Sequence, residues 1–257
     1  MSAVCNSDFT NKRAVITGGA GGIGRCIAEA FLAAGADIAV IDLDAAGGDR
    51  LAAAYPGRVL FFAGDVADET VLEDFSQQVV DRFGQVDYLI NNACLTRGGV
   101  LSGCPAEDFN YVLRVGVTAT YLLALLLRDH FAAGGSIVNI ASTRAVMSQP
   151  DTESYSAAKG GIRALTHALA VSLAGRVRVN CISPGWIDNA GVITDAADIR
   201  QHPAGRIGRP EDIAAAALFL CGGQAGFING EEITIDGGMT KQMIYHGDYG
   251  WEFTVDS

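Results

Sequence analysis

Short apolar runs rich in β-branched residues alternate along the chain with longer stretches in which apolar residues recur at helical spacing. The longer stretches predict helices near residues 22–34, 69–83, 106–131, 154–174 and 210–221. The short runs predict seven strands, at residues 13–17, 37–41, 59–63, 88–91, 136–141, 178–182 and 232–235. Such alternation is typical of a parallel sheet covered by helices on both faces. We therefore predict an α/β fold with a doubly wound, seven-stranded parallel sheet.

The length of the chain favours one folding unit. Its 257 residues, 49% of them hydrophobic, are enough to bury one large core. There is no internal repeat, low-complexity tract or linker to mark a boundary, so we predict a single domain over residues 1–257. Two segments lack a clear helix or strand pattern. Residues 185–203 are a candidate substrate lid, and residues 239–257 form a C-terminal tail whose aromatic residues favour either packing or substrate contact.

The charge balance narrows the class of partner. The chain has 18 Lys and Arg residues against 29 Asp and Glu residues, and the net charge of −11 repels nucleic acid and anionic lipid. The six cysteines form no CxxC pair and the four histidines are scattered, so we expect reduced thiols and no metal site. The N-terminus has no leader pattern, and the apolar stretch 121–127 is too short to cross a bilayer. We predict a cytoplasmic protein with no nucleic-acid or membrane partner.

A glycine-rich turn follows the first predicted strand directly. It has the sequence Thr-Gly-Gly-Ala-Gly-Gly-Ile-Gly over residues 17–24 and leads into the first predicted helix. Glycines allow the backbone to approach a pyrophosphate closely, and the helix N-terminus adds amide donors and the positive end of the helix dipole. A position between strand and helix makes a dinucleotide site a more specific prediction than glycines alone would. The arrangement predicts a Rossmann-type fold.

Asp42 closes the second predicted strand, 24 residues after Gly18. A carboxylate at that place accepts hydrogen bonds from an adenosine ribose and repels a 2′-phosphate. The loop itself contains no arginine or lysine, because Arg25 comes after its last glycine. The sequence therefore favours NAD over NADP, and the alternative is that Asp42 only caps a surface turn.

Tyr155 and Lys159 stand four residues apart in a predicted helix, and Tyr155 comes thirteen residues after Ser142. Residues four apart are neighbours on one helical face. An ammonium group beside a phenol stabilises the phenolate, so we expect the pKa of Tyr155 to move from ~10 toward neutrality. Such a tyrosine can exchange a proton with an alcohol.

Several motifs in a fixed order make the chain similar to the short-chain dehydrogenase/reductase family over residues 12–238. The motifs are TGxxxGxG at 17–24, Asp65-Val66, Asn91-Asn92-Ala93-Cys94, Ser142, the YxxxK pair Tyr155 and Lys159, and Pro184-Gly185-Trp186-Ile187. The chain resembles glucose, alcohol and hydroxysteroid dehydrogenase-like members that use NAD. The resemblance implies hydride transfer between NAD(H) and a secondary alcohol or ketone.

The resemblance also implies roles for the matched residues. Ser142 orients the substrate oxygen, Tyr155 exchanges the proton, and Lys159 bonds the nicotinamide ribose and lowers the pKa of Tyr155. Asn91 braces the sheet instead of binding the cofactor. The implied cofactor-binding residues are Gly18, Gly22, Ile23, Gly24, Asp42, Asp65, Val66, Asn92, Ala93, Tyr155, Lys159, Pro184, Gly185 and Ile187.

The family further implies a homotetramer, or else a dimer, built through the predicted helices at 106–131 and 154–174. The aromatic tail is then a candidate to reach the pocket of a neighbouring subunit.

The three residues between Tyr155 and Lys159 favour carbonyl chemistry. Enoyl reductases of the family have a longer gap, and the extended sugar-nucleotide epimerases have a differently spaced glycine loop in a longer chain. The identity of the substrate stays open among cyclic alcohols, steroids and sugars. The alternative function is an NAD(H)-binding regulatory or structural protein with weak turnover.

Three positions depart from the family pattern. Gly116 stands where a catalytic asparagine usually lies, so we expect a kink there and a proton relay that depends on the backbone carbonyl. Cys94 replaces a glycine beside the cofactor, and Asn189 stands where a threonine often holds the carboxamide. For these two we expect either a change in cofactor affinity or no effect.

Overall fold

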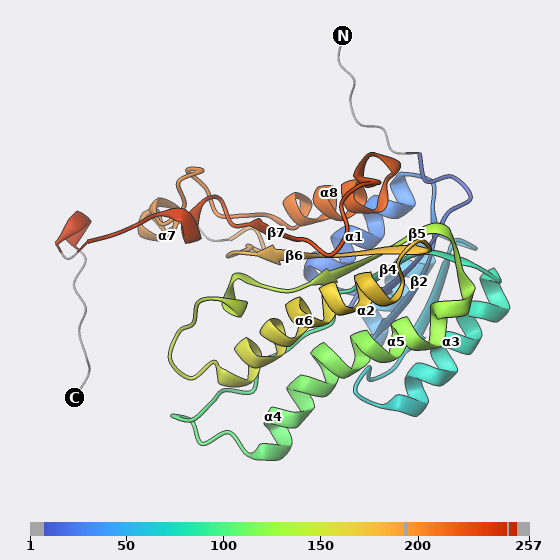
Figure 1. Cartoon of the computed structure of the whole chain (residues 1–257), viewed down its shortest axis with the longest axis horizontal. Helices are drawn as coiled ribbons and strands as arrows, with labels where there is room; N and C mark the ends of the chain where they lie inside the picture. Colours follow the sequence, from blue (N-terminus) through green and yellow to red (C-terminus); the bar gives the residue numbers. More distant parts are fainter. Residues whose placement is uncertain (1–7, 193–194, 246, 251–257) are drawn as a thin grey trace, which may run out of the picture.

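The computed structural model describes residues 8–192, 195–245 and 247–250. Within them, seven strands form one parallel sheet in the order β3-β2-β1-β4-β5-β6-β7 (Figure 1). The strand order reverses between β1 and β4. The predicted doubly wound α/β fold with a seven-stranded parallel sheet is therefore confirmed. The strands are β1 (Arg13–Thr17), β2 (Asp37–Asp42), β3 (Val59–Ala63), β4 (Val86–Asn91), β5 (Phe131–Ile140), β6 (Val177–Pro184) and β7 (Glu232–Ile235).

Three strands have the predicted bounds, and the other four differ at their ends. The largest difference is in β5, which begins at Phe131, five residues before the prediction. Its first residues include Ala-Ala-Gly-Gly, which have little strand preference of their own. Pairing with neighbours extends the strand, since Phe131 lies opposite Val86 of β4 and Gly135 opposite Val177 of β6.

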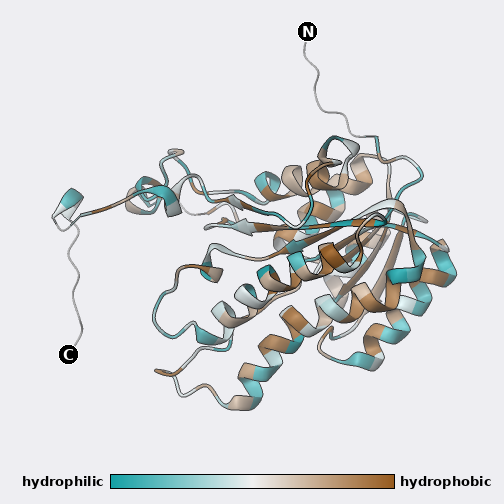
Figure 2. Cartoon of the chain, in the orientation of Figure 1, coloured by the Kyte–Doolittle hydropathy of each residue, from teal (hydrophilic) through white to brown (hydrophobic). Residues whose placement is uncertain are grey.

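Helices cover both faces of the sheet (Figure 1). Neighbouring strand residues point to opposite faces, so Ile16 belongs to one apolar layer and Val15 to the other. Figure 2 shows the apolar strands enclosed between helices whose outer surfaces are more hydrophilic. One face carries α1 (Gly22–Ala33), α2 (Ala45–Ala54) and α8 (Pro210–Cys221), and the other carries α3 (Glu69–Phe83), α5 (Ala119–Leu127) and α6 (Glu153–Ser172).

Helix α2 is absent from the sequence prediction because its first turn contains a Gly-Gly pair, which weakens a helix. Close packing explains the glycines. A Cβ on Gly48 would lie 2.0 Å from the ring of Phe61 in β3, and the side chain of Asp44 caps the helix by accepting from the amide of Gly47 at 2.9 Å. Gly48 therefore lets α2 approach the sheet.

The predicted helix at 106–131 is divided into four pieces. α4 (Ala106–Leu113) continues through a π-helical turn at Arg114–Thr118 into α5, and a 3-10 turn at Arg128–His130 ends the run. Gly116 lies inside the π turn, so the expected kink is a local widening of the helix.

By length and composition the run Ala106–His130 could cross a membrane, and 44% of its most apolar window is buried within the fold. Core helices of soluble proteins share this length and composition. Here α5 packs against α3, and α4 packs against α6.

The two segments without predicted elements leave the sheet on the same side (Figure 1). After β6, the described part of 185–203 contains a bridge between Ile187 and Gly208 and the short helix α7 (Ala196–Arg200). After β7, 3-10 turns occur at Met239–Lys241 and Asp248–Gly250. The tail residues Trp251 and Phe253 lie outside the described part of the chain.

Candidate active site

A cavity of about 390 Å³ opens where the strand order reverses, at the carboxyl ends of the strands. In doubly wound sheets this crevice is where ligands bind. Many of the residues predicted to bind a cofactor line it. The lining includes Gly18, Ile23, Asp42, Asp65, Val66, Asn92 and Ala93, together with Cys94, Tyr111 and Asn189.

The glycine loop brings the start of α1 against the end of β1. Gly18 has φ 67°, in the left-handed region that glycine adopts without strain. A Cβ on Gly24 would lie 2.0 Å from the carbonyl oxygen of Gly18, so only glycine permits this approach. Gly21 is the N-cap of α1, with nothing within 4 Å of its Cβ position, and no side chain among the described residues caps the helix. This open, uncapped helix N-terminus fits a dinucleotide pyrophosphate.

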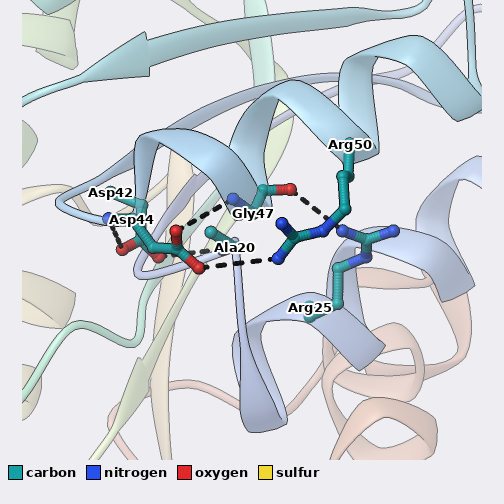
Figure 3. A network of polar contacts seen from close by, with 6 residues as sticks. All are labelled: Ala20, Arg25, Asp42, Asp44, Gly47 and Arg50. Carbon is teal, nitrogen blue, oxygen red and sulfur yellow. Dashed lines mark hydrogen bonds and ion pairs between the residues drawn. The ribbon is translucent and has the colours of Figure 1, made fainter.

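Asp42 belongs to a polar network that ties the loop to the second strand (Figure 3). Its carboxylate accepts from the amide of Ala20 at 2.8 Å and from the amide of Asp44 at 3.0 Å. Asp42 therefore caps a turn, one of the two alternatives that the sequence left open, and it also lines the cavity.

Two arginines lie near this network, and both already have partners. Arg25 donates to Glu29 at 2.7 Å. Figure 3 shows its contact with the carbonyl of Gly47, at 3.2 Å, and that of Arg50 with Asp44, at 3.9 Å. The carboxylates of Asp42 and Asp44 line the cavity, whereas neither arginine does. The wall at this end is therefore acidic.

The asparagine pair after β4 serves the framework. Asn91 donates to Asn139 of β5 at 2.8 Å, which confirms that it braces the sheet. Asn92 lies in the cavity wall, but its side-chain amide donates to the carbonyls of Thr17 and Gly18 at 3.1 and 3.0 Å. The hydroxyl of Thr17 accepts from the backbone amides of Asn92 and Ala93. These hydrogen bonds join the end of β1 to the segment that follows β4.

Ser142, Tyr155 and Lys159 meet beside the carboxyl end of β5. Ser142 is buried, and its Oγ accepts from the amide of Arg144 at 3.1 Å. Lys159 on α6 is 1% exposed, and its Nζ donates to the carbonyl of Ile140 at 2.7 Å. Nζ also lies 5.4 Å from the centre of the Tyr155 ring. The structure thus gathers the three side chains that the sequence predicts to be catalytic.

The expected lowering of the tyrosine pKa is wrong for this arrangement. Burial is the largest influence and raises the pKa of Tyr155 well above its usual value, and Cys94 raises it further, while a hydrogen bond with Ser142 and the charge of Arg144 lower it. Desolvation penalises the phenolate more strongly than the Ser142 hydrogen bond and the charge of Arg144 stabilise it. Spacing on a helix predicts which groups are neighbours, but it does not reveal how deeply the phenol is buried.

Gly116 faces helix α6 next to Lys159. A Cβ at this position would lie 3.2 Å from the Cβ of Ala158 and 3.8 Å from Ile162. The Gly116 carbonyl, to which the sequence assigns a part in the proton relay, accepts from the hydroxyl of Thr120 at 2.7 Å. The lack of a side chain therefore allows the π turn and α6 to pack closely.

The segment after β6 forms another part of the wall. Pro184 pairs with Ile235, and a Cβ on Gly185 would lie 2.6 Å from the Cβ of Asp236, so the turn passes close to β7. Asn189 approaches the glycine loop, because a Cβ on Gly22 would lie 3.3 Å from its Oδ1. Ile187 is held by its bridge to Gly208, next to the hydrogen bond from the amide of Asp188 to the Gly208 carbonyl at 2.9 Å.

The sequence does not predict that Tyr111 lines the site, and it does not predict that Cys94 contacts Tyr155. The hydroxyl of Tyr111 donates to Asp65 at 2.8 Å, from a position 46 residues further along the chain. Cys94 reaches the hydroxyl of Tyr155, so it contacts the catalytic group as well as the cavity. No spacing rule predicts either contact, because each joins elements that only the fold brings together.

Other parts of the described chain add no second cluster of this kind. A larger cavity, about 990 Å³, lies at the amino ends of the strands between Lys12, Arg176 and Phe227, and none of the predicted site residues lines it. Among the described residues, no group of three or more His, Cys, Asp or Glu side chains is placed to hold a metal ion.

Comparison with known proteins gives agreeing results. Residues 18–240 match the family model described as "Enoyl-(Acyl carrier protein) reductase". The chain is 42% identical over 250 residues to an uncharacterized oxidoreductase of Thermotoga maritima, covering 91% of this chain and 98% of that protein. It is 37% identical over 252 residues to L-fucose dehydrogenase of Mus musculus, covering 93% and 91%. An apo SCOR enzyme from Clostridium thermocellum superposes with a TM-score of 0.89 at 45% identity, over 96% of this chain and all of that one.

Proposed function

The chain belongs to the short-chain dehydrogenase/reductase family, and from that premise we propose that it transfers a hydride between NAD(H) and a secondary alcohol or ketone. The observation that carries the proposal is the convergence of Ser142, Tyr155 and Lys159 at the sheet edge that also holds the glycine loop. These three side chains do not line the 390 Å³ cavity themselves, but Cys94 lines it and reaches the hydroxyl of Tyr155, so the proton-transfer groups stand next to the dinucleotide cradle.

In this proposal the chain's own residues handle the oxygen and its proton. The Oγ of Ser142 accepts from the amide of Arg144 and is hydrogen-bonded to the Tyr155 hydroxyl, so Ser142 and Tyr155 are placed to hold one substrate oxygen between them. Tyr155 donates its proton to that oxygen during reduction and takes it back during oxidation. Lys159 holds its charge beside the phenol while the Ile140 carbonyl fixes its ammonium group. NAD(H), when bound, supplies or accepts the hydride.

The acidic wall supports NAD as the cofactor. Asp42 and Asp44 both line the cavity, and a 2′-phosphate there would meet two carboxylates. Arg25 is already held by Glu29, so neutralising an added phosphate would require breaking that contact, and Arg50 lies outside the cavity lining, 3.9 Å from Asp44.

Two observations favour carbonyl over alkene reduction, although the matching family model is described as an enoyl reductase. The three-residue gap between Tyr155 and Lys159 is short, and both side chains lie at one place beside Ser142. A relative at 37% identity is an L-fucose dehydrogenase, which by its name is a dehydrogenase of a sugar. Sugars and other secondary alcohols are therefore suitable first substrates.

The proposal predicts that Tyr155→Phe abolishes turnover while cofactor binding persists. We expect a loss of about 100-fold to 10,000-fold in kcat, the usual contribution of a positioned acid or base. The assay follows NADH absorbance with a panel of sugars and other secondary alcohols and their ketones, each tried with NAD and NADP. Calorimetric titration with NAD provides the binding readout, and Tyr121→Phe on the exposed face of α5 is the matched control.

The outcomes separate this function from the alternative of an NAD(H)-binding regulatory or structural protein. Activity that survives Tyr155→Phe contradicts the mechanism. Tight NAD binding with no turnover on any substrate favours the regulatory protein instead, and a preference for NADP contradicts the cofactor assignment.

The proposal extends to a cytoplasmic homotetramer. Leu125 on α5 and Val171 on α6 are 39% and 77% exposed, apolar side chains that a second copy could cover. The described tail supports a role in assembly as well, because Met243, Ile244 and Tyr245 are all exposed.

A further inference from the structure

Tyr111 lies on α4 and lines the cavity together with Asp65, which follows β3 in the chain. Its hydroxyl donates to Oδ2 of Asp65 at 2.8 Å. The other carboxylate oxygen, Oδ1, accepts from the backbone amide of Ala67 at 2.9 Å. Both oxygens of Asp65 are therefore held, one by its own turn and one by a helix 46 residues away.

The carboxylate keeps the capacity to bind a ligand. Each carboxylate oxygen has two lone pairs, and each uses one in the hydrogen bonds above. Asp65 and Tyr111 both line the cavity, with Val66 and Leu95 adding apolar wall. The remaining acceptor sites thus stand beside a surface suited to the flat face and polar edge of a purine.

Two arginines keep the Tyr111 ring in place. The guanidinium carbons of Arg97 and Arg114 lie 5.6 and 5.8 Å from the ring centre, within the range of cation–π attraction. Burial and the hydrogen bond to Asp65 both raise the pKa of Tyr111, with burial the larger cause. The phenol consequently stays protonated in neutral solution and acts only as a donor toward Asp65.

We infer that Tyr111 is a positioning residue for the adenine end of the cofactor: it fixes the Asp65 carboxylate so that its free lone pairs meet the exocyclic amino group of adenine. This inference rests on the proposed function, since it deepens the account of the same cofactor site. It assigns Tyr111 no part in proton or hydride transfer.

A fixed carboxylate discriminates between purines by their six-position. Adenine offers an amino group that donates to a carboxylate, whereas hypoxanthine offers a carbonyl oxygen that a carboxylate repels. Sites that hold a hydrogen-bonding partner rigidly reject analogues that lack it, because the polar groups of the site are then left unpaired. Without Tyr111, Asp65 keeps the Ala67 bond but can turn its other oxygen away, so the discrimination weakens.

The experiment measures Kd by calorimetry for NAD, for nicotinamide hypoxanthine dinucleotide and for nicotinamide mononucleotide, which has no purine. For the unaltered protein we expect NAD to bind about tenfold more tightly than the hypoxanthine analogue, the factor expected for one hydrogen bond to a charged group. For Tyr111→Phe, the Kd for NAD should rise severalfold, and the two dinucleotides should come within about twofold of each other. Tyr121→Phe and the mononucleotide serve as controls and should show no change.

The possible results distinguish a failure of the positioning role of Tyr111 from a failure of the proposed function. If Tyr111→Phe leaves the NAD to hypoxanthine ratio unaltered, or weakens all three ligands equally, the positioning role is wrong while the proposed function stands. If the unaltered protein binds no dinucleotide, the proposed function fails and this inference fails with it. Circular dichroism of the variant confirms that the fold is retained.

Discussion

At the scale of single residues, the hydroxyl of Tyr155 is subject to opposing influences. Burial and Cys94 raise the pKa of Tyr155, whereas Ser142 and the charge of Arg144 lower it. The net effect is upward, which keeps the phenol protonated at neutral pH. A protonated phenol is ready to donate, so the free protein is prepared for ketone reduction.

We predict that Cys94→Ala makes alcohol oxidation faster at neutral pH. Oxidation needs the deprotonated tyrosine, whose fraction below the pKa rises tenfold with each pH unit. Removal of the thiol removes one cause of the raised pKa of Tyr155, so the rise in oxidation rate should move to lower pH. The measurement is kcat for oxidation and for reduction against pH.

The matched control is Cys104→Ala, because the thiol of Cys104 contacts the carbonyl of its own neighbour Pro105. The reduction rate of both variants should stay level near neutral pH. An oxidation profile of Cys94→Ala that is unchanged or displaced to higher pH contradicts the assigned influence of the thiol.

At the scale of elements, the π turn at Arg114–Thr118 shows why a family position can change its residue. A Cβ atom built on Gly116 would lie 3.2 Å from the Cβ of Ala158, the residue before Lys159. A larger side chain would push α4 and α5 away from α6. This movement would also disturb Lys159 on α6. The absence of an asparagine side chain at position 116 therefore lets the π turn pack tightly against α6.

We predict that Gly116→Asn gives no gain in turnover and lowers the free energy of unfolding by about 1–3 kcal/mol, the usual cost of overpacking. Denaturant titration measures the stability, and NADH absorbance measures kcat. Gly223→Asn is the control, because nothing lies within 4 Å of its Cβ position. A large gain in turnover would instead show that the proton relay is impaired because the asparagine of the family is absent at position 116.

The elements also show how far patterns along the chain predict the fold. The bounds of β1, β3, β7, α3 and α8 agree because each has a clear period and clear end signals. Helix α2 escapes prediction because Gly47 and Gly48, which weaken a helix locally, are needed where it meets Phe61 and Asp44. The start of β5 escapes because its neighbours, and not its own residues, make it a strand.

At the scale of the whole molecule, the described tail leaves the body of the fold beyond β7 (Figure 1). Met243, Ile244 and Tyr245 are 73%, 43% and 68% exposed, although apolar side chains are stabilised by burial. Cover from a second copy of the chain is the physical reason we propose for these exposed residues.

We predict that deletion of the residues after Lys241 changes the oligomeric state or raises KM for the alcohol. Light scattering with size-exclusion chromatography measures the mass, and steady-state kinetics measure KM and kcat. A triple change of Met243, Ile244 and Tyr245 to Ser keeps the length of the tail and separates apolar contact from simple truncation. Unchanged mass and kinetics in both variants reject a role for the tail.

The sequence by itself determined the sheet, the glycine loop, Asp42 and the trio Ser142, Tyr155 and Lys159, because periodicity and short spacing are local properties of a chain. Only the tertiary structure decided what lies beside them. The burial that raises the pKa of Tyr155, the thiol of Cys94 against it and the clamp of Tyr111 on Asp65 all depend on residues far apart in sequence. Desolvation and long-range contacts arise from packing, and packing follows from the fold as a whole.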